Sequence, residues 1–107
     1  SLPTSGMQED HVSMAWLAAR KLRRVVDNVR RILAVEYVCA ARALDLRAPL
    51  EPSMATDVLR ALLRRVVAGP GPDRYLAPEL AAAEQLLDSS ELHDAWSSVG
   101  VVLARLR

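Results

Sequence analysis

The sequence of 107 residues is poor in cysteine, in excess charge of either sign and in long apolar runs. Cys39 is its only cysteine, so the chain cannot form an internal disulfide and does not resemble a disulfide-stabilised secreted scaffold. Fourteen Lys and Arg against thirteen Asp and Glu leave a formal charge of +1, whereas general nucleic-acid binders carry a marked basic excess. No apolar run reaches the roughly 20 residues that cross a bilayer, and no signal peptide is visible. We therefore expect a cytoplasmic protein that binds neither nucleic acid nor membrane.

Phenylalanine is also absent and glycine is scarce, whereas Ala, Leu, Arg and Val dominate. Ala, Leu and Arg are strong helix formers because they lose little side-chain freedom in a helix. The composition therefore predicts an all-α fold, with a long central helix and two or three shorter helices. The expected helices cover residues 7–46, 54–68, 78–88 and 90–96, while residues 97–107 remain open between strand, helix and frayed end.

Local signals support these boundaries. Ser5 with Gln8 three residues later has the spacing of a capping box, which would start the first helix near Met7. Ser53 is a candidate N-cap for the second helix, and Gly69-Pro70-Gly71-Pro72 ends it. Pro78 fits the first turn of the third helix, where its missing N–H costs nothing.

The expected first helix changes character along its length. Between Arg20 and Leu33 apolar residues recur at spacings of three and four, and most of the charged residues share the opposite face, which we interpret as a solvated outer face. Residues 33–40 are apolar on nearly every side, which is typical of a helix buried on every side. A rod of about 36 residues would be ~54 Å long, too long for the rest of the chain to surround. We therefore predict self-association through this helix, or packing against other segments.

Several single residues have both a structural and a chemical interpretation. Glu36 lies on the apolar face, where we favour an ion pair with an arginine of a neighbouring helix over a catalytic role. Trp16 and Trp96 are expected to be packing anchors, and Cys39 an inert core thiol. Two histidines without a His-x-x-x-His or Cys-x-x-Cys pair predict no metal site. The sequence also lacks a Gly-x-Ser-x-Gly elbow and a phosphate-binding glycine loop.

The densest polar cluster is Gln8-Glu9-Asp10-His11. An amide, two carboxylates and an imidazole side by side could orient a substrate or move a proton. On spacing alone we favour the other interpretation of these residues, helix capping and dipole matching, because both are generic at helix starts.

The segment around this cluster, Leu2-Pro3-Thr4-Ser5-Gly6-Met7-Gln8-Glu9-Asp10-His11-Val12-Ser13-Met14, resembles a signature of the aromatic amino acid ammonia-lyases and aminomutases, which include histidine ammonia-lyase. The resemblance continues in register through residues 32–36, 43–47 and 73–79, and reaches about Leu92. It therefore covers most of the chain.

The resemblance implies a helical, cytoplasmic homotetramer with long central helices. Such enzymes carry a methylidene-imidazolone electrophile, formed from an internal Ala-Ser-Gly, and eliminate ammonia from histidine, tyrosine or phenylalanine; aminomutases add it back at the β carbon. Glu9 matches the acidic residue that faces the substrate, in a catalytic and substrate-binding role, and Gln8 matches a neighbouring substrate-binding amide. Ala-Ser-Gly does not occur in this sequence, so the cofactor is expected in another part of the parent enzyme.

The chain is thus interpreted as the C-terminal part of such an enzyme, inactive as an isolated fragment. Gly6-Met7 before Gln8 slightly favours tyrosine or phenylalanine over histidine as the substrate. The alternative is a non-enzymatic helical self-association module derived from a lyase gene.

Overall fold

The computed structural model describes residues 3–8 and 12–105 and confirms the all-α fold. A 3-10 turn at Ser5–Met7 precedes helix α1, Ala15–Leu46. Three shorter helices follow: α2 at Met54–Arg64, α3 at Ala77–Leu87 and α4 at Ser90–Arg105. In the described ranges no helix is long and apolar enough to cross a membrane.

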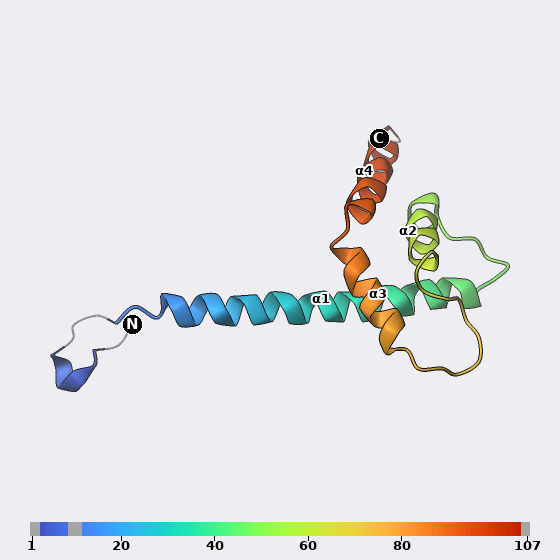
Figure 1. Ribbon diagram of the computed structural model, residues 1–107. Helices are drawn as coiled ribbons and strands as arrows, with labels where there is room; N and C mark the ends of the chain where they lie inside the picture. The colour runs from blue at the N-terminus through green and yellow to red at the C-terminus, as the bar shows by residue number, and fades with distance from the viewer. Residues whose placement is uncertain (1–2, 9–11, 106–107) are drawn as a thin grey trace.

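The helices are distributed unevenly along α1. Figure 1 shows α1 as a long rod, with α2 and α3 gathered at its C-terminal half and α4 pointing away from it. Its N-terminal half, followed by the 3-10 turn, extends alone from this group. The radius of gyration of 20.8 Å is far above the ~13 Å of a compact domain of about this length. The chain is therefore an extended helical assembly whose long helix is covered over only part of its length.

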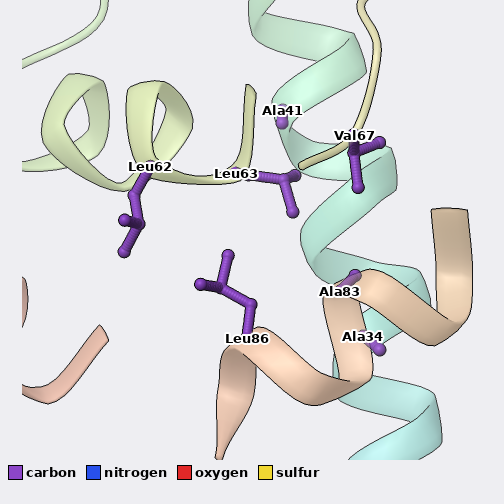
Figure 2. Packing of buried hydrophobic residues seen from close by; sticks show 7 residues of the cluster. All are labelled: Ala34, Ala41, Leu62, Leu63, Val67, Ala83 and Leu86. Atoms are coloured by element: carbon purple, nitrogen blue, oxygen red, sulfur yellow. The ribbon is translucent and has the colours of Figure 1, made fainter. Parts of the chain in front are cut away.

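The core lies where α3 crosses α1, under the end of α2 (Figure 2). Ala34 and Ala41 on α1 and Ala83 on α3 are buried there, and their small side chains let the two helix backbones approach closely. Larger apolar side chains fill the space beside them: Leu62, Leu63, Val67 and Leu86. Because few large side chains are buried among the described residues, at about 1.5–3 kcal/mol each, the core is modest.

The long helix begins eight residues later than the sequence predicts. Ser5, Gly6 and Met7 have φ values of 52°, 63° and 70°, which are left-handed and incompatible with a right-handed helix start. The predicted capping box is therefore wrong: the backbone N–H of Gln8 donates to the carbonyl of Ser5 at 3.2 Å. The helix starts instead at Ala15, whose N–H donates to the Ser13 hydroxyl at 3.4 Å.

The second helix is shorter than predicted, ending at Arg64 rather than at residue 68. Val67 turns inward and is almost completely buried, and the Arg64 guanidinium donates to the carbonyls of Val67 and Ala68. At the other end of α2, the prediction of Ser53 as N-cap is confirmed, because its hydroxyl accepts from the Thr56 N–H at 3.4 Å.

The last two helices agree in position with the prediction, except at the C-terminal end. Helix α3 starts at Ala77 with Pro78 in its first turn, as expected. Helix α4 continues to Arg105, nine residues past the predicted end at 96, so most of the ambiguous tail is helical. Val99 on α4 is buried, which anchors this continuation.

Three expectations about burial are wrong within this chain. Glu36 is exposed and makes no ion pair with any described side chain. Cys39 is exposed rather than a core thiol. Trp16 and Trp96 are 76% and 61% exposed, so neither is a packing anchor here. Trp16 lies on the part of α1 that extends alone (Figure 1), whereas Glu36, Cys39 and Trp96 border open grooves between the helices.

Candidate functional site

Within the signature segment, Ser5–Met7 form a tight left-handed turn that is followed by Gln8. Two residues other than glycine, Ser5 and Met7, hold positive φ values, an arrangement that costs energy and is concentrated at functional sites. Gln8 is exposed, and its side-chain amide can both donate and accept hydrogen bonds. Glu9, the predicted catalytic residue, lies outside the described residues together with Asp10 and His11.

This turn is remote from the rest of the chain. In Figure 1 it lies beyond the N-terminal end of α1, whereas α2, α3 and α4 lie toward the opposite end. The polar side chains of those three helices are therefore not brought to Gln8. Any group that completes a site around the signature must come from another segment of polypeptide, and the roles of Gln8 and Glu9 stay predictions.

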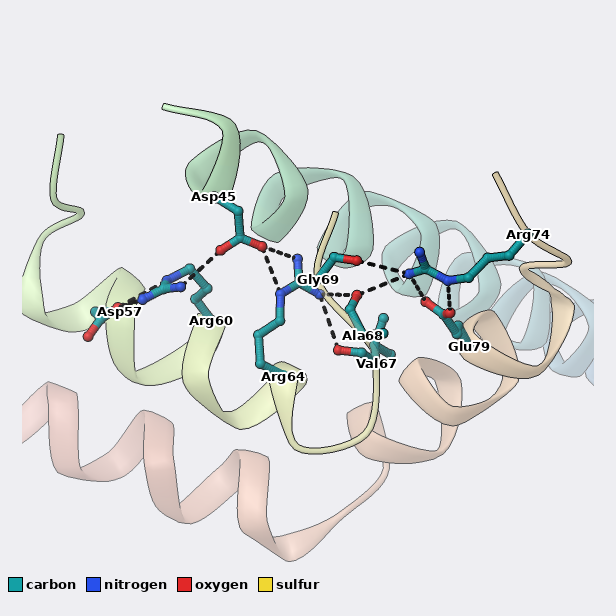
Figure 3. Close-up of polar contacts among 9 residues, drawn as sticks. All are labelled: Asp45, Asp57, Arg60, Arg64, Val67, Ala68, Gly69, Arg74 and Glu79. Atoms are coloured by element: carbon teal, nitrogen blue, oxygen red, sulfur yellow. Dashed lines mark hydrogen bonds and ion pairs between the residues drawn. The ribbon is translucent and has the colours of Figure 1, made fainter. Parts of the chain in front are cut away.

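The strongest polar cluster lies at the C-terminal end of α1 and consists of Asp45 and two arginines of α2 (Figure 3). Arg60 Nη1 donates to Asp45 Oδ1 at 2.9 Å, and Arg64 Nε donates to Asp45 Oδ2 at 2.8 Å. Arg60 also donates through Nε and Nη2 to Asp57 on its own helix. Burial opposes ionisation of Asp45, but the hydrogen bonds from the two arginines outweigh it, so its pKa lies below the ordinary value. This clasp fixes α2 against α1.

A second cluster fixes the loop between α2 and α3. The Arg74 guanidinium donates through Nε and Nη2 to the two carboxylate oxygens of Glu79, and through Nη2 to the carbonyls of Ala68 and Gly69. The hydrogen bond from Arg74 lowers the pKa of Glu79. The guanidiniums of Arg64 and Arg74 thus bind the same stretch of backbone after α2. Together they hold the start of α3 beside the end of α2.

A groove of about 540 Å³ opens between α1, α2, α3 and α4. Its lining is mostly apolar, with Glu36 and His93 as its ionisable groups besides Tyr37. The Tyr37 hydroxyl donates to the Leu59 carbonyl at 2.5 Å, and burial raises the pKa of this phenol. No three ligating side chains gather around a point in the described part of the chain as a metal ion requires. The groove therefore suits an apolar partner surface better than a polar substrate.

Sequence reasoning missed both arginine clusters. The only local signal was the spacing Asp57, Arg60, Arg64, which aligns three charged side chains on one face of α2. The Asp45 contacts join residues 15 and 19 positions apart, which no local pattern reveals, and Arg74 and Glu79 are five positions apart, which is not a helical ion-pair spacing. Both clusters are structural, because they position helices and leave no charged group free for a substrate.

Comparison with known proteins identifies the family to which this chain is related. The family model described as "Aromatic amino acid lyase" matches residues 1–65. Two histidine ammonia-lyases, from Streptomyces griseus and Streptomyces coelicolor, are 56% and 53% identical over 107 and 100 residues. These matches cover 97% and 92% of this chain but only 21% and 20% of the relatives, so the chain spans about a fifth of their length.

A solved structure agrees with the sequence relatives. The tyrosine aminomutase of Streptomyces globisporus superposes with a TM-score of 0.76 at 37% identity, over 92% of this chain and 19% of that one. The matched family model includes the signature turn and all of α1, and the structural likeness extends over nearly the whole chain. The chain therefore belongs to the aromatic amino acid lyase family.

Proposed function

We propose that this chain is the C-terminal part of an enzyme that eliminates ammonia from an aromatic amino acid, as an ammonia-lyase or as an aminomutase. The observation that carries the proposal is the match to the family model over residues 1–65, which contains the whole signature turn. Relatives named histidine ammonia-lyase are 50–56% identical, against 37% for the tyrosine aminomutase. This difference favours histidine as the first substrate to test, ahead of the tyrosine or phenylalanine that Gly6-Met7 suggests.

Within that enzyme, this chain would contribute one wall of the substrate pocket. Gln8 would orient the substrate through its amide, and Glu9 would hold the amino group or move a proton beside it. The methylidene-imidazolone would make the amino group of the substrate a better leaving group. This chain cannot form that group, because the sequence contains no Ala-Ser-Gly. The chain alone is therefore proposed to be inactive.

The N-terminal half of α1, residues 15–30, is the bare half of this helix, because no other described helix packs along it (Figure 1). It supports a further part of the proposal, association with other subunits. Four large apolar side chains of α1 are more than half exposed: Trp16, Leu22, Val25 and Ile32. Apolar surface of this extent marks an interface in a stable protein. We propose that α1 packs against helices of the whole subunit and of its copies in a homotetramer.

The enzymatic proposal is tested in the full-length protein that carries this tract. The purified protein is assayed for formation of the α,β-unsaturated acid and of the β-amino acid from histidine, tyrosine and phenylalanine. We expect turnover of one of the three, and we expect Glu9→Gln to lower kcat by a factor of roughly 10²–10⁴, the usual size of a general acid–base contribution. Glu51→Gln is the matched control, because Glu51 is an exposed loop residue far along the chain. Absence of turnover with all three substrates contradicts the proposal.

The second candidate function is a non-enzymatic helical module, and the uncovered half of α1 is the observation that favours it. The two candidates differ in the mass of the native polypeptide. A native chain about five times as long as this one, like the relatives, supports the enzyme. A native mass near 11.7 kDa supports the module.

A further inference from the structure

A second, smaller pocket lies between the C-terminal half of α1 and the segment that joins α2 to α3. Its volume is about 200 Å³, and it shares no lining residue with the groove described above. Aliphatic side chains form much of its wall: Val35, Val38, Pro70, Leu76 and Leu80. The wall also includes three guanidiniums and one carboxylate, those of Arg42, Arg64, Arg74 and Glu79. The pocket thus joins an apolar surface to an excess of cations.

The charges around this pocket do not cancel. Arg64 binds Asp45 and Arg74 binds Glu79, so each of these two guanidiniums has a carboxylate partner. Arg42 is exposed and has no ion-pair partner among the side chains that the structure describes. The pKa of Glu79 is lowered chiefly by the hydrogen bond from Arg74, and the charge of Arg42 adds to this effect, so that charge reaches the pocket. Three guanidiniums against the two carboxylates leave one positive charge, which suits a monoanion.

The pocket also offers N–H donors that no described acceptor uses. The bonds of Arg74 to Glu79 and to two backbone carbonyls use its Nε and Nη2 atoms, whereas its Nη1 atom makes no hydrogen bond to a described residue (Figure 3). The N–H donors of the Arg42 guanidinium have no partner in the described part of the chain either. Guanidinium N–H groups form short, charge-assisted hydrogen bonds with carboxylates. A carboxylate in the pocket therefore finds unused donors on two arginines.

The volume and the apolar wall indicate what the rest of the ligand is. A cavity of roughly 150 Å³ with apolar walls holds a benzene ring. The 200 Å³ of this pocket therefore leaves room for one ring and a short acid side chain. Guanidinium planes stack on aromatic faces, and the bonds of Arg64 and Arg74 to their partners lie in those planes, which leaves the faces available. An inorganic anion would use the donors but not the aliphatic wall.

We propose that this pocket binds a small aromatic monocarboxylate. Its carboxylate accepts hydrogen bonds from Arg42 and from Nη1 of Arg74, and its ring lies on the aliphatic side chains of α1 and α3. The inference goes beyond the proposed function, because the pocket lies in the covered half of the molecule, away from the signature turn (Figure 1). It does not require the chain to be part of an enzyme.

The first test uses Cys39 to report whether the pocket is occupied, because its exposed thiol lines the pocket. The full-length protein that carries this tract is treated with iodoacetamide, and alkylation of Cys39 is followed by mass spectrometry of its peptide. The probe is 3-phenylpropanoate, with an expected Kd on the order of 1 mM for a ligand of this size. At ten times that Kd it should slow alkylation about tenfold, because only the empty pocket exposes the thiol.

Two matched compounds separate the parts of the ligand. The neutral amide 3-phenylpropanamide keeps the ring without the charge, and acetate keeps the charge without the ring. Each should protect Cys39 far less than 3-phenylpropanoate at the same concentration. Equal protection by either compound overturns the proposed ligand class. A Cys39 that is not alkylated even without ligand shows that the pocket is closed in the whole protein, which also overturns the proposal.

The second test removes the unpaired charge. Arg42→Gln should raise the Kd of 3-phenylpropanoate by roughly tenfold, because it removes a charge-assisted contact and no described partner depends on it. Arg47→Gln is the matched control: it makes the same change of charge at the end of α1, on an exposed residue that does not line the pocket. Its Kd should stay unchanged. An unchanged Kd in Arg42→Gln overturns the proposal, as does absence of protection in the unmodified protein. Neither result touches the assays for ammonia elimination, because the readout is local to Cys39.

Discussion

The two halves of α1 have different surroundings. The C-terminal half has Ala34 and Ala41 buried under α3 and has Asp45 clasped by two arginines of α2. The N-terminal half has no buried residue, and it leads to the signature turn that carries Gln8. The part of the chain that is packed is therefore distant from the part expected to meet the substrate. The comparison teaches that α2–α4 stabilise one end of a long helix, whereas none of these helices covers the other end (Figure 1).

The largest difference between the halves should appear when a leucine is truncated. Leu63 is completely buried in the core beside α1, so Leu63→Ala should lower the free energy of unfolding by about 2–5 kcal/mol. Leu22→Ala, on the bare half and 64% exposed, should change it by less than about 0.5 kcal/mol in dilute monomeric chain. Urea denaturation followed by circular dichroism measures both. Equal effects would show that the two halves are equally packed.

Removing the charge of Asp45 should have the next largest effect. Asp45→Asn leaves the guanidiniums of Arg60 and Arg64 without their shared acceptor, at an expected cost of about 1–3 kcal/mol. Asp27→Asn is the matched control, because its pair with Arg30 is 3.6 Å long and partly exposed, and Arg30 keeps a second partner in Asp88. The same denaturation experiment compares the two variants. A cost for Asp27→Asn as large as that for Asp45→Asn would contradict the view that the clasp stabilises the covered half.

The clasp also predicts how stability depends on pH. The pKa of Asp45 and that of Glu79 lie below their ordinary values in the folded chain, so the unfolded chain binds more protons near pH 4. Their contribution is therefore complete only above the ordinary pKa values, from about pH 5 upward, and is lost as the pH falls through the lower, folded pKa values. Denaturation midpoints between pH 2 and 6 measure this loss. Asp45→Asn should flatten the profile, and an unchanged slope would exclude Asp45 as its source.

The sequence analysis predicted the features that depend on short-range interactions and missed features that have no local sequence signal. The caps at Ser53 and Pro78 and the helical composition are local properties, and the structure confirms the fold that they predict. The start of α1 was placed too early because Ser5 and Gln8 have capping-box spacing, while the left-handed φ values of Ser5 and Met7 have no sequence signal.

In the candidate site, too, some residues could be found from the sequence and others could not. Gln8 and Glu9 were found through resemblance to a family, since their helix-start spacing alone is generic. The Asp45 cluster was missed because Asp45 is 15 and 19 residues from its partners, and only the packing of α2 against α1 brings them together. Arg74 and Glu79 are five residues apart, a spacing that matches neither of the helical ion-pair spacings. Burial of Glu36 and Cys39 was expected from an apolar row that this chain only partly covers.

The smallest expected effect compares one substitution at two exposed alanines of the same helix. Glycine costs about 0.5–1 kcal/mol relative to alanine in a helix that is folded as part of the cooperative unit. Ala43→Gly lies in the covered half and should lower the free energy of unfolding by this amount. Ala19→Gly lies in the bare half, which can fray without opening the core, so its effect on global unfolding should be less than half as large. Denaturation of dilute chain measures both, and hydrogen exchange should show faster exchange at residues 15–30 than at residues 34–46. At high concentration the proposed association through α1 should shrink the difference between the two variants, because the N-terminal half would then unfold together with its partner. A difference that persists unchanged at high concentration would show that association does not order this half of the helix.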